Sequence, residues 1–413
     1  MARKRQTEKG QTIIDLAQEA GLTLMTDATT ASDITDWLPT GIPQIDYVLA
    51  GGFPYGRISE VYGKNASGKS SLAVALTKQV QKFNGNVVWI DVEATASTEN
   101  MVKQGADPNK IYLVQPNEGE RLTVEGLTKQ IEAIIDVFEK TDTPLLLIWD
   151  SLAATPVDYE LEDDSNVNRI GVRAKAIQAM FTKIGQRVTN TNIAFIILNQ
   201  ARDDMSNSFN PNAIKSSGGN ALEHSATLRL EVARGKANKA KVTDPITGKD
   251  KEEVTSYIFR TKVIKSKVSP ANRQAESYLI SYPFKGMDFV ENIYQSSIAS
   301  AQSKSQFGLI TSGAWREYVP MNESLETVKL RDSEWVPFLE SEEGYPYLEE
   351  LFLRQMIAVF PHDYAPLHNE HLDITAEPLY AKLKEYYDSL PEDTKEEFTS
   401  IEESEEEVDE NGE

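Results

Sequence analysis

One short loop, residues 63–70, constrains the fold of this chain more than any other stretch. It reads Gly-Lys-Asn-Ala-Ser-Gly-Lys-Ser, the pattern G-x-x-x-x-G-K-S whose backbone N–H groups surround phosphates. Residues 57–62 before it have the character of a buried strand, and residues 71–83 after it carry apolar side chains at helical spacing. A strand, a glycine-bearing loop and a helix N-terminus together make an anion site, because unpaired amides and the helix dipole face the phosphate. The loop therefore predicts an α/β protein that binds a nucleotide.

The composition excludes several other classes of protein. The 413 residues suffice for two or three domains, and 40% hydrophobic with 26% charged residues is typical of a soluble globular chain. Without cysteine there are no disulfides, thiolate metal sites or cysteine nucleophiles, and the four histidines have no metal-ligand spacing. No apolar run approaches ~18 residues, and the basic N-terminus leads into no apolar segment of a secretory signal. We therefore expect a cytoplasmic protein with no membrane segment.

The net charge of −22 is unevenly distributed. Residues 392–413 contain twelve acidic residues and one lysine, whereas residues 169–273 contain nineteen Lys or Arg and eight Asp or Glu. An acidic tail attached to a basic middle is a charge asymmetry that suits nucleic acid as a partner. A solubilising tail with scattered surface lysines explains the same pattern without any partner.

Uniformly apolar strands alternate with amphipathic helices through the middle of the chain. The predicted strands are 86–91, 111–114, 144–149 and 193–198, and the predicted helices are 97–104, 120–139 and 172–188. This order is typical of a mostly parallel, twisted sheet flanked by helices. Strands at 228–233, 256–265 and 276–282, with a polar hairpin at 235–253, predict an antiparallel extension of the sheet.

The two ends of the chain differ from this core. One short helix, Thr12–Ala20, is predicted near the N-terminus, and a small α+β domain is predicted after residue 283. It has helices at 293–301, 347–359 and 378–389 and a short strand near 315–319. The predicted divisions are an N-terminal helical segment (1–37), a nucleotide-binding core (38–283), a C-terminal α+β domain (284–390) and an acidic disordered tail (391–413). The N-terminal segment is too small for a core of its own, so we expect it to contact either the main domain or another subunit.

Polar side chains that follow the apolar strands are the candidates for chemistry. Lys69 can reach the terminal phosphates, and the Ser70 hydroxyl with Asp150, at the end of strand 144–149, is suited to Mg²⁺. A carboxylate just past strand 86–91 could polarise an attacking water, but spacing alone does not separate Glu93 from Asp91. Gln200 is either a sensor of the terminal phosphate or a strand-end cap. The predicted nucleotide contacts are Gly63, Lys64, Asn65, Ala66, Ser67, Gly68, Lys69, Ser70 and Ser71.

Two long polar loops, residues 158–169 and 202–217, follow buried elements on the same edge of the predicted sheet. Long loops in a compact domain are usually functional or disordered. Basic residues in and near them predict a groove for a phosphate backbone: Arg169, Arg173, Lys175, Arg202 and Lys215. Within the loops the aromatic residues are Tyr159 and Phe209, which favours tracking of the backbone over stacking on bases.

The motifs in this order resemble those of RecA-type recombinases. They are residues 51–72 around the phosphate loop, I-D-V-E-A-T (90–95), W-D-S-L-A-A-T-P (149–156), I-L-N-Q-A-R (197–202), S-S-G-G-N-A-L (216–222) and T-K-V-I-K-S-K-V-S-P-A-N-R-Q-A-E (261–276). The resemblance covers residues 38–283 and extends weakly to residues 312–315. The remaining segments do not match, which suggests a divergent, phage-encoded member.

The resemblance implies an ATP- and Mg²⁺-dependent filament on single-stranded DNA that pairs it with double-stranded DNA and exchanges strands. It assigns Glu93 as the catalytic carboxylate and Gln200 as the phosphate sensor. It places Gly218, Gly219 and Asn220 at the far end of a DNA loop, and it makes Lys265 and Lys267 reach the ATP of an adjacent subunit. Single-strand-binding and mediator proteins are further expected partners.

The chain also departs from the family at four positions. Asn100 and Ser97 stand near the expected adenine site, where the family has an aromatic and an acidic residue, so nucleotide selectivity is open. Glu223 and His224 replace a basic and an aromatic residue, which leaves the subunit coupling open. The tail is either a competitor of DNA for the basic surface or a solubilising segment.

Two alternatives to a recombinase remain at this point. A ring-shaped helicase can be built on the same core, and a recombination mediator could keep the fold without turnover. Closed rings, rather than open filaments, would indicate the first. The presence of Lys69, Ser70, Glu93 and Asp150 disfavours the second.

Overall fold

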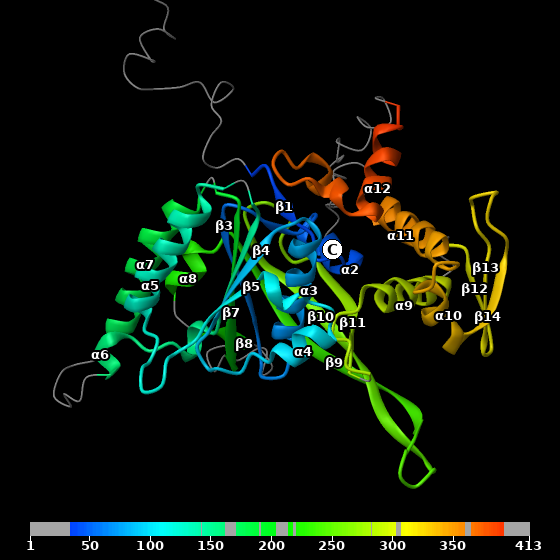
Figure 1. Ribbon diagram of the computed structural model, residues 1–413, viewed down its shortest axis with the longest axis horizontal. Helices are drawn as coiled ribbons and strands as arrows, with labels where there is room; N and C mark the ends of the chain where they lie inside the picture. Colours follow the sequence, from blue (N-terminus) through cyan, green and yellow to red (C-terminus); the bar gives the residue numbers. More distant parts are fainter. Residues whose placement is uncertain are drawn as a thin grey trace, which may run out of the picture. The chain divides into compact units, whose positions relative to one another are not determined.

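The computed structural model describes residues 34–141, 143–161, 171–189, 191–203, 214–217, 220–281, 283–302, 307–359 and 365–391 (Figure 1). The described residues from Thr35 onward belong to one compact unit. The predicted helix Thr12–Ala20 and the acidic tail lie outside the described residues. The predicted domain divisions stay predictions.

A central mixed sheet organises this unit. Its order is β11-β10-β9-β3-β7-β6-β4-β5, and β8 pairs with β7. The strands from β9 to β5 pair in parallel, and β10 and β11 join antiparallel, as the sequence predicts. The short strand β8, which lies in the predicted polar loop 202–217, also pairs antiparallel. The strands are β3 (Arg57–Gly63), β4 (Asn86–Asp91), β5 (Ile111–Val114), β6 (Leu145–Asp150), β7 (Ile193–Asp203), β8 (Ile214–Ser216), β9 (Leu228–Thr243), β10 (Asp250–Ser266) and β11 (Gln274–Ile280).

Helices cover both faces of the parallel part, which explains why its strands are apolar throughout. In β6, Leu145, Leu147 and Trp149 face one core, and Leu146 and Ile148 face the other. Figure 1 shows α5, α7 and α8 grouped on one side of the sheet, and the second core includes the buried side of α3. The helices of this region are α3 (Lys69–Lys82), α4 (Thr98–Lys103), α5 (Val124–Phe138), α6 (Asp158–Leu161), α7 (Val172–Val188) and α8 (Asn220–Ser225).

Several boundaries differ from the predicted ones. The helix expected at 120–139 begins at Val124, because the Thr123 side chain caps it by accepting from the Gly126 N–H. The strand expected at 193–198 continues to Asp203, because β8 pairs with its end. The polar hairpin expected at 235–253 is the extended end of β9 and β10, which pair as far as Thr243 and Asp250.

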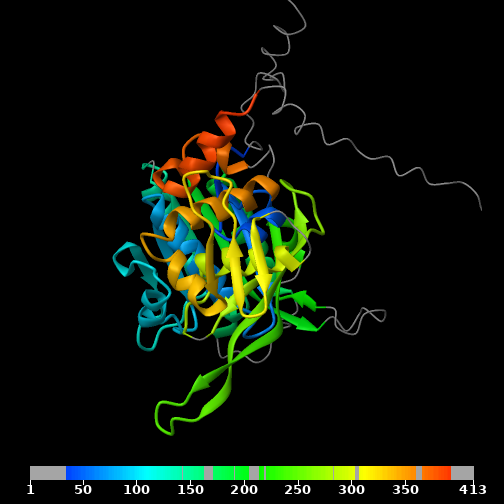
Figure 2. The same cartoon turned by 90° about the vertical axis from the view of Figure 1, so that its right-hand side faces the viewer.

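The C-terminal region packs on the same core. Its second sheet, β12 (Leu309–Ser312), β13 (Trp315–Tyr318) and β14 (Val328–Arg331), is antiparallel and is seen in yellow in Figure 2. The rings of Phe83, at the end of α3, and Tyr380, in α12, lie 6.0 Å apart, so this region is joined to the phosphate-loop helix. Its helices are α9 (Phe289–Gln302), α10 (Asp332–Leu339), α11 (Tyr345–Val359) and α12 (Pro378–Asp388).

Shorter elements complete the described chain. They are β1 (Trp37–Leu38), α2 (Pro43–Leu49), β2 (Phe53–Pro54) and the 3₁₀ turns η1 (Pro108–Lys110), η2 (Leu152–Ala154), η3 (Ala365–His368) and η4 (Ile374–Ala376). Asp36 connects the beginning of the described chain to its C-terminal region. Its carboxylate accepts hydrogen bonds from the backbone N–H groups of His371 and Leu372 at 2.8 and 2.7 Å.

Candidate functional site

The carboxyl ends of four parallel strands bring the candidate residues to one edge of the sheet. The strand register places Gly63 beside Gln200 and Asp150 beside Asp91. Open parallel sheets bind their ligands at this edge. The fold therefore gathers residues from four separate sequence motifs around the phosphate loop.

Two different constraints on the backbone explain the two glycines of the phosphate loop. A side chain at Gly63 would place its Cβ 2.2 Å from the carbonyl oxygen of Val232, in the neighbouring strand β9. Gly68 has a φ of +101° and directly precedes α3, so the chain turns there in a conformation that favours glycine. The N-terminus of α3, beginning at Lys69, consequently faces the loop and can donate to phosphate oxygens.

The Lys69 side chain folds back onto the phosphate loop. Its Nζ donates to the carbonyl oxygens of Gly63 and Lys64, each at 3.0 Å. Partial burial lowers the pKa of Lys69, and the nearby carboxylates of Asp150 and Glu93 oppose that shift. A phosphate would replace the two carbonyl oxygens as the acceptor, so the ammonium is held at the place where the charge is needed.

Ser70 and Asp150 lie together on the same edge. The Ser70 hydroxyl donates to Asp150 Oδ2 at 3.4 Å, although eighty residues separate them. Burial, with help from the negative charges of Asp91 and Glu93, raises the pKa of Asp150 to about 6. A hydroxyl and a carboxylate that lacks a tight cation partner form a donor set that suits Mg²⁺ completed by phosphate and water oxygens. Among the described residues no cluster of three or more acidic or histidine side chains could bind a metal without such help.

Asp91 and Glu93 occupy different environments. Asp91 is buried, and its carboxylate accepts from the N–H groups of Thr95 and Ala96 and from the Gln115 amide. Because β4 ends at Asp91, strand alternation does not extend to Glu93. Glu93 is exposed, and its Oε1 accepts from the Ser151 hydroxyl at 3.2 Å. Of the two, the exposed Glu93 is the carboxylate that a water molecule can reach.

Gln200 lies in β7 beside Ser217, the residue that directly follows the end of β8. Its backbone N–H donates to Asn199 Oδ1 at 3.0 Å, and its carbonyl accepts from the Ser217 N–H at 3.0 Å. The polar loop predicted at residues 202–217 therefore begins two residues after Gln200 and ends at Ser217, which is bonded to Gln200.

Lys265 and Lys267 lie in two different environments. The ammonium of Lys265 donates to the carbonyl oxygens of Glu223 and His224 in α8 of the same chain. Partial burial and the positive charges of Lys267 and Arg229 lower the pKa of Lys265. Lys267 is exposed. Lys267 can therefore be reached without rearrangement, whereas Lys265 must first leave α8.

The predicted DNA contacts lie at several places. Arg202 and Lys215 are opposite each other in the β7–β8 pair. Arg173 is already engaged, with Glu160 at 3.1 Å and with the carbonyl oxygens of Leu152 and Ala153. Lys175 is exposed on α7, and Asn220 begins α8. Arg169, Gly218 and Gly219 lie outside the described residues, and all eight roles stay predictions.

A pocket of about 220 Å³ adjoins the phosphate loop, and sequence reasoning missed the residues on its far side. Besides residues 66–71 it is lined by Arg234, Leu279, Ile280, Ser281 and Phe284. Its apolar and aromatic walls suit the nucleoside part of a nucleotide. Asn100 and Ser97 do not line it; Ser97 instead caps α4, accepting from the Asn100 N–H. Only the fold could place β11 and residue 284 there, since more than 200 residues separate them from the loop.

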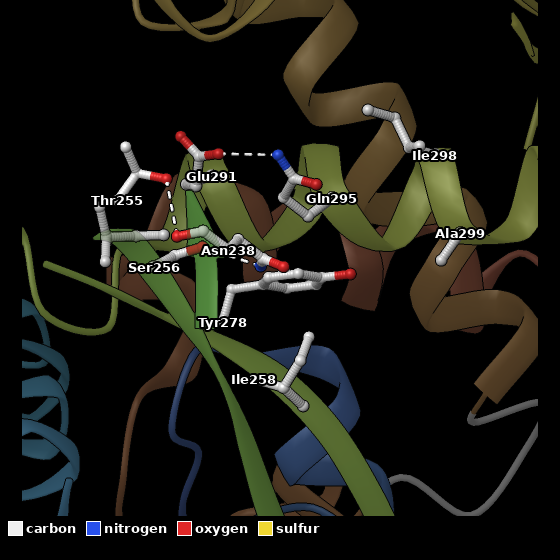
Figure 3. Close-up of a pocket in the computed structure, with 10 residues that line it drawn as sticks. Asn238, Thr255, Ser256, Ile258, Tyr278, Glu291, Gln295, Ile298 and Ala299 are labelled. Atoms are coloured by element: carbon white, nitrogen blue, oxygen red, sulfur yellow. Dashed lines mark hydrogen bonds between the residues drawn. The ribbon is translucent and has the colours of Figure 1, made fainter. Parts of the chain in front are cut away.

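A second pocket, of about 340 Å³, lies between the antiparallel extension and α9 (Figure 3). Tyr278 and Ile258 stand on the strand side of it, and Glu291 and Gln295, which are hydrogen bonded at 2.9 Å, come from α9. None of its lining residues is a lysine or arginine. This pocket is therefore unsuited to phosphate.

Comparison with known proteins agrees with this geometry. The sequence model of the RecA N-terminal domain matches residues 13–286. The chain belongs to the RecA family. It is 31% identical to the RecA protein of Bacteroides thetaiotaomicron over 283 residues, which cover 68% of this chain and 77% of that protein. It is 29% identical to the RecA protein of Francisella philomiragia over 337 residues, covering 81% and 85%. With the RecA protein of Porphyromonas gingivalis the identity is 28% over 312 residues, covering 74% and 83%.

Membership of the RecA family establishes the predicted fold class and a role in DNA recombination and repair that involves ATP and DNA. The matched region ends between β11 and α9, so α9, the second sheet and the helices after it lie beyond the RecA N-terminal domain. No helix in the described ranges has the length and apolar character needed to cross a bilayer.

Proposed function

We propose that this chain is a DNA-dependent ATPase that assembles as a helical filament on single-stranded DNA and catalyses homologous pairing and strand exchange. One observation carries the proposal: the phosphate loop, Asp150, Glu93 and Gln200 share a sheet edge, and Gln200 is bonded to the base of a polar loop. In this proposal, the hydrogen bond between Gln200 and Ser217 links ATP hydrolysis to DNA binding. The cytoplasm is the compartment that we propose for it.

The proposed hydrolysis uses residues whose positions are described above. Lys69 and the N-terminus of α3 hold the phosphates, and Ser70 with Asp150 would hold Mg²⁺, which neutralises charge on the phosphate oxygens. Glu93, oriented by the Ser151 hydroxyl, accepts a proton from the attacking water. Gln200 hydrogen bonds to the terminal phosphoryl group and is released when that group leaves.

A neighbouring subunit completes the site in this proposal. Lys267, and Lys265 once it leaves the α8 carbonyls, would stabilise charge developing on the terminal phosphoryl oxygens. Strand β5 offers a surface for the proposed assembly, because it forms the edge of the sheet and exposes Tyr112 and Leu113. Exposed apolar side chains on an unpaired edge strand are suited to a contact with a second copy.

ATPase activity measured with and without single-stranded DNA tests the proposal. We expect stimulation by DNA that weakens as the salt concentration rises, because phosphate contacts release counterions. Electron micrographs with ATP and single-stranded DNA should show open filaments. Closed rings, or an ATPase rate that DNA does not change at any salt concentration, would contradict the proposal.

A further inference from the structure

Arg229 holds three elements of the site together from a buried position. It lies in β9 with 5% of its surface exposed. Its Nε donates to Glu60 Oε2 at 2.7 Å, its Nη2 donates to the Ser216 hydroxyl at 2.8 Å, and its Nη1 lies 3.2 Å from Glu223 Oε1. Glu60 belongs to β3, the strand that ends in the phosphate loop, whereas Ser216 and Glu223 lie on either side of residues 217–222. One guanidinium thus spans the phosphate strand and the base of the polar loop.

Asn199 closes this network on the other side. Its amide donates to Glu60 Oε1 at 2.9 Å and to the Ser217 carbonyl oxygen, and its Oδ1 accepts from the Gln200 N–H. Glu60 and Asn199 are both fully buried. The two oxygens of Glu60 therefore bind Arg229 and Asn199, and each of these residues in turn binds one residue of the pair Ser216–Ser217.

Burial makes this arrangement resist partial changes. Charge-assisted hydrogen bonds strengthen in a low dielectric, and an unpaired buried charge is costly. The guanidinium presents its donors in a fixed planar fork, so Arg229 cannot follow one acceptor without weakening its bonds to the others. A shift of Gln200 moves Asn199, and the Glu60–Arg229 pair then imposes a matching shift on Ser216.

We propose that Arg229 is a positioning residue that couples occupancy of the phosphate site to the conformation of the DNA loop, through its bond to Ser216. This inference rests on the proposed function, because it concerns the coupling between the same two sites. The phosphate strand and the base of the loop move as one unit through Arg229, whereas Gln200 supplies the contact with the phosphate.

Two neighbouring serines provide a matched test. Ser216→Ala removes the acceptor of Arg229 Nη2 and leaves the buried pair with Glu60 in place. Ser217→Ala is the control, because the Ser217 hydroxyl is buried with no hydrogen-bond partner among the described residues. The measurement is the affinity of the full chain for a labelled oligodeoxythymidylate, with and without a non-hydrolysable ATP analogue. The ratio of the two affinities reports the coupling.

Couplings between two sites commonly amount to factors of about 5 to 150. We expect Ser216→Ala to reduce the ratio at least about fivefold, and Ser217→Ala to leave it as in the unsubstituted chain. Affinity for the analogue without DNA and the thermal midpoint should match in all three proteins. Arg229→Lys, which keeps the charge beside Glu60 but lacks the planar fork, should also lower the ratio.

The outcomes separate the two proposals. If Ser216→Ala keeps the ratio, or if Ser217→Ala lowers it equally, the role of Arg229 is overturned and the proposed function stands. If the unsubstituted chain shows no effect of the analogue on DNA affinity, the proposed function itself fails and the coupling with it.

Discussion

Glu60 and Arg229 form a buried ion pair of 2.7 Å across the boundary between β3 and β9. They stand directly opposite each other in the parallel register of these strands, although 169 residues separate them in the chain. The Arg229 guanidinium also lies 5.4 Å from the centre of the Tyr62 ring. Strand β3, which leads into the phosphate loop, is therefore held to β9 by this ion pair as well as by backbone hydrogen bonds.

Arg229→Met should destabilise the fold by about 3–5 kcal/mol, because it leaves the Glu60 carboxylate buried without its partner. Urea denaturation of the full chain measures this change. The double variant Glu60→Met/Arg229→Met should recover most of the loss, since it removes both charges. A double variant as unstable as the single one would show that shape, rather than charge, is decisive there.

Lys69→Ala and Glu93→Gln should separate binding from hydrolysis. Loss of the Lys69 ammonium should lower the hydrolysis rate at least about 10²-fold, the usual cost of one charge-stabilising donor, and should weaken nucleotide binding. Glu93→Gln should retain binding, because Glu93 contacts Ser151 rather than the phosphate loop, while hydrolysis is lost. Steady-state ATPase and equilibrium binding of a fluorescent nucleotide provide the two readouts. Full hydrolysis by Glu93→Gln would exclude Glu93 as the base.

Asp150→Asn should stabilise the nucleotide-free protein at neutral pH. Burial raises the pKa of Asp150 from 3.8 to about 6, so the folded chain holds the proton more tightly than the unfolded chain. The contribution of Asp150 therefore lowers the free energy of unfolding as pH rises from about 4 to about 6, and this loss persists above that range. The substitution should restore up to about 3 kcal/mol at pH 7.5 and nothing at pH 4. Thermal melts at the two pH values measure the difference.

The raised pKa of Asp150 also predicts that Mg²⁺-dependent nucleotide binding varies with pH. Mg²⁺ requires the ionised form of Asp150, so Mg²⁺-dependent nucleotide affinity should fall up to about tenfold for each pH unit below 6. Titrations of a fluorescent nucleotide across pH 5–8 check this, with a Mg²⁺-free series as the control. An equal slope in both series would mean that another group is responsible.

Tyr112→Asp should weaken self-assembly, because Tyr112 is 57% exposed on the edge strand β5. Tyr386→Asp on α12, where the tyrosine is 39% exposed, is a matched control. Light scattering in the presence of ATP and single-stranded DNA measures the filament mass. Equal assembly by both variants would remove β5 from the proposed contact.

Removal of the acidic residues 392–413 should increase binding to double-stranded DNA at low Mg²⁺ if the tail competes for the basic surface. Gel-shift titrations with and without the tail measure the affinity. Unchanged binding would favour the solubilising role.

The phosphate loop, the class of fold and most of the elements around the site can be predicted from the sequence alone. These features are local: a glycine pattern, a helical repeat or an apolar strand is written in adjacent residues. Helix α7, for example, has the predicted bounds, because its apolar spacing and its preceding Gly171 both lie within that segment.

Which polar residues come into contact depends on the complete fold. Spacing could not separate Asp91 from Glu93, because the end of β4 depends on its neighbours in the sheet. Likewise, Phe284 near the phosphate loop and Ser216 on Arg229 follow from the order and register of β9, β10 and β11 rather than from any motif. The physical reason is that burial and charge pairing act between residues far apart in the chain, and their energies are set only once the strands have taken their places.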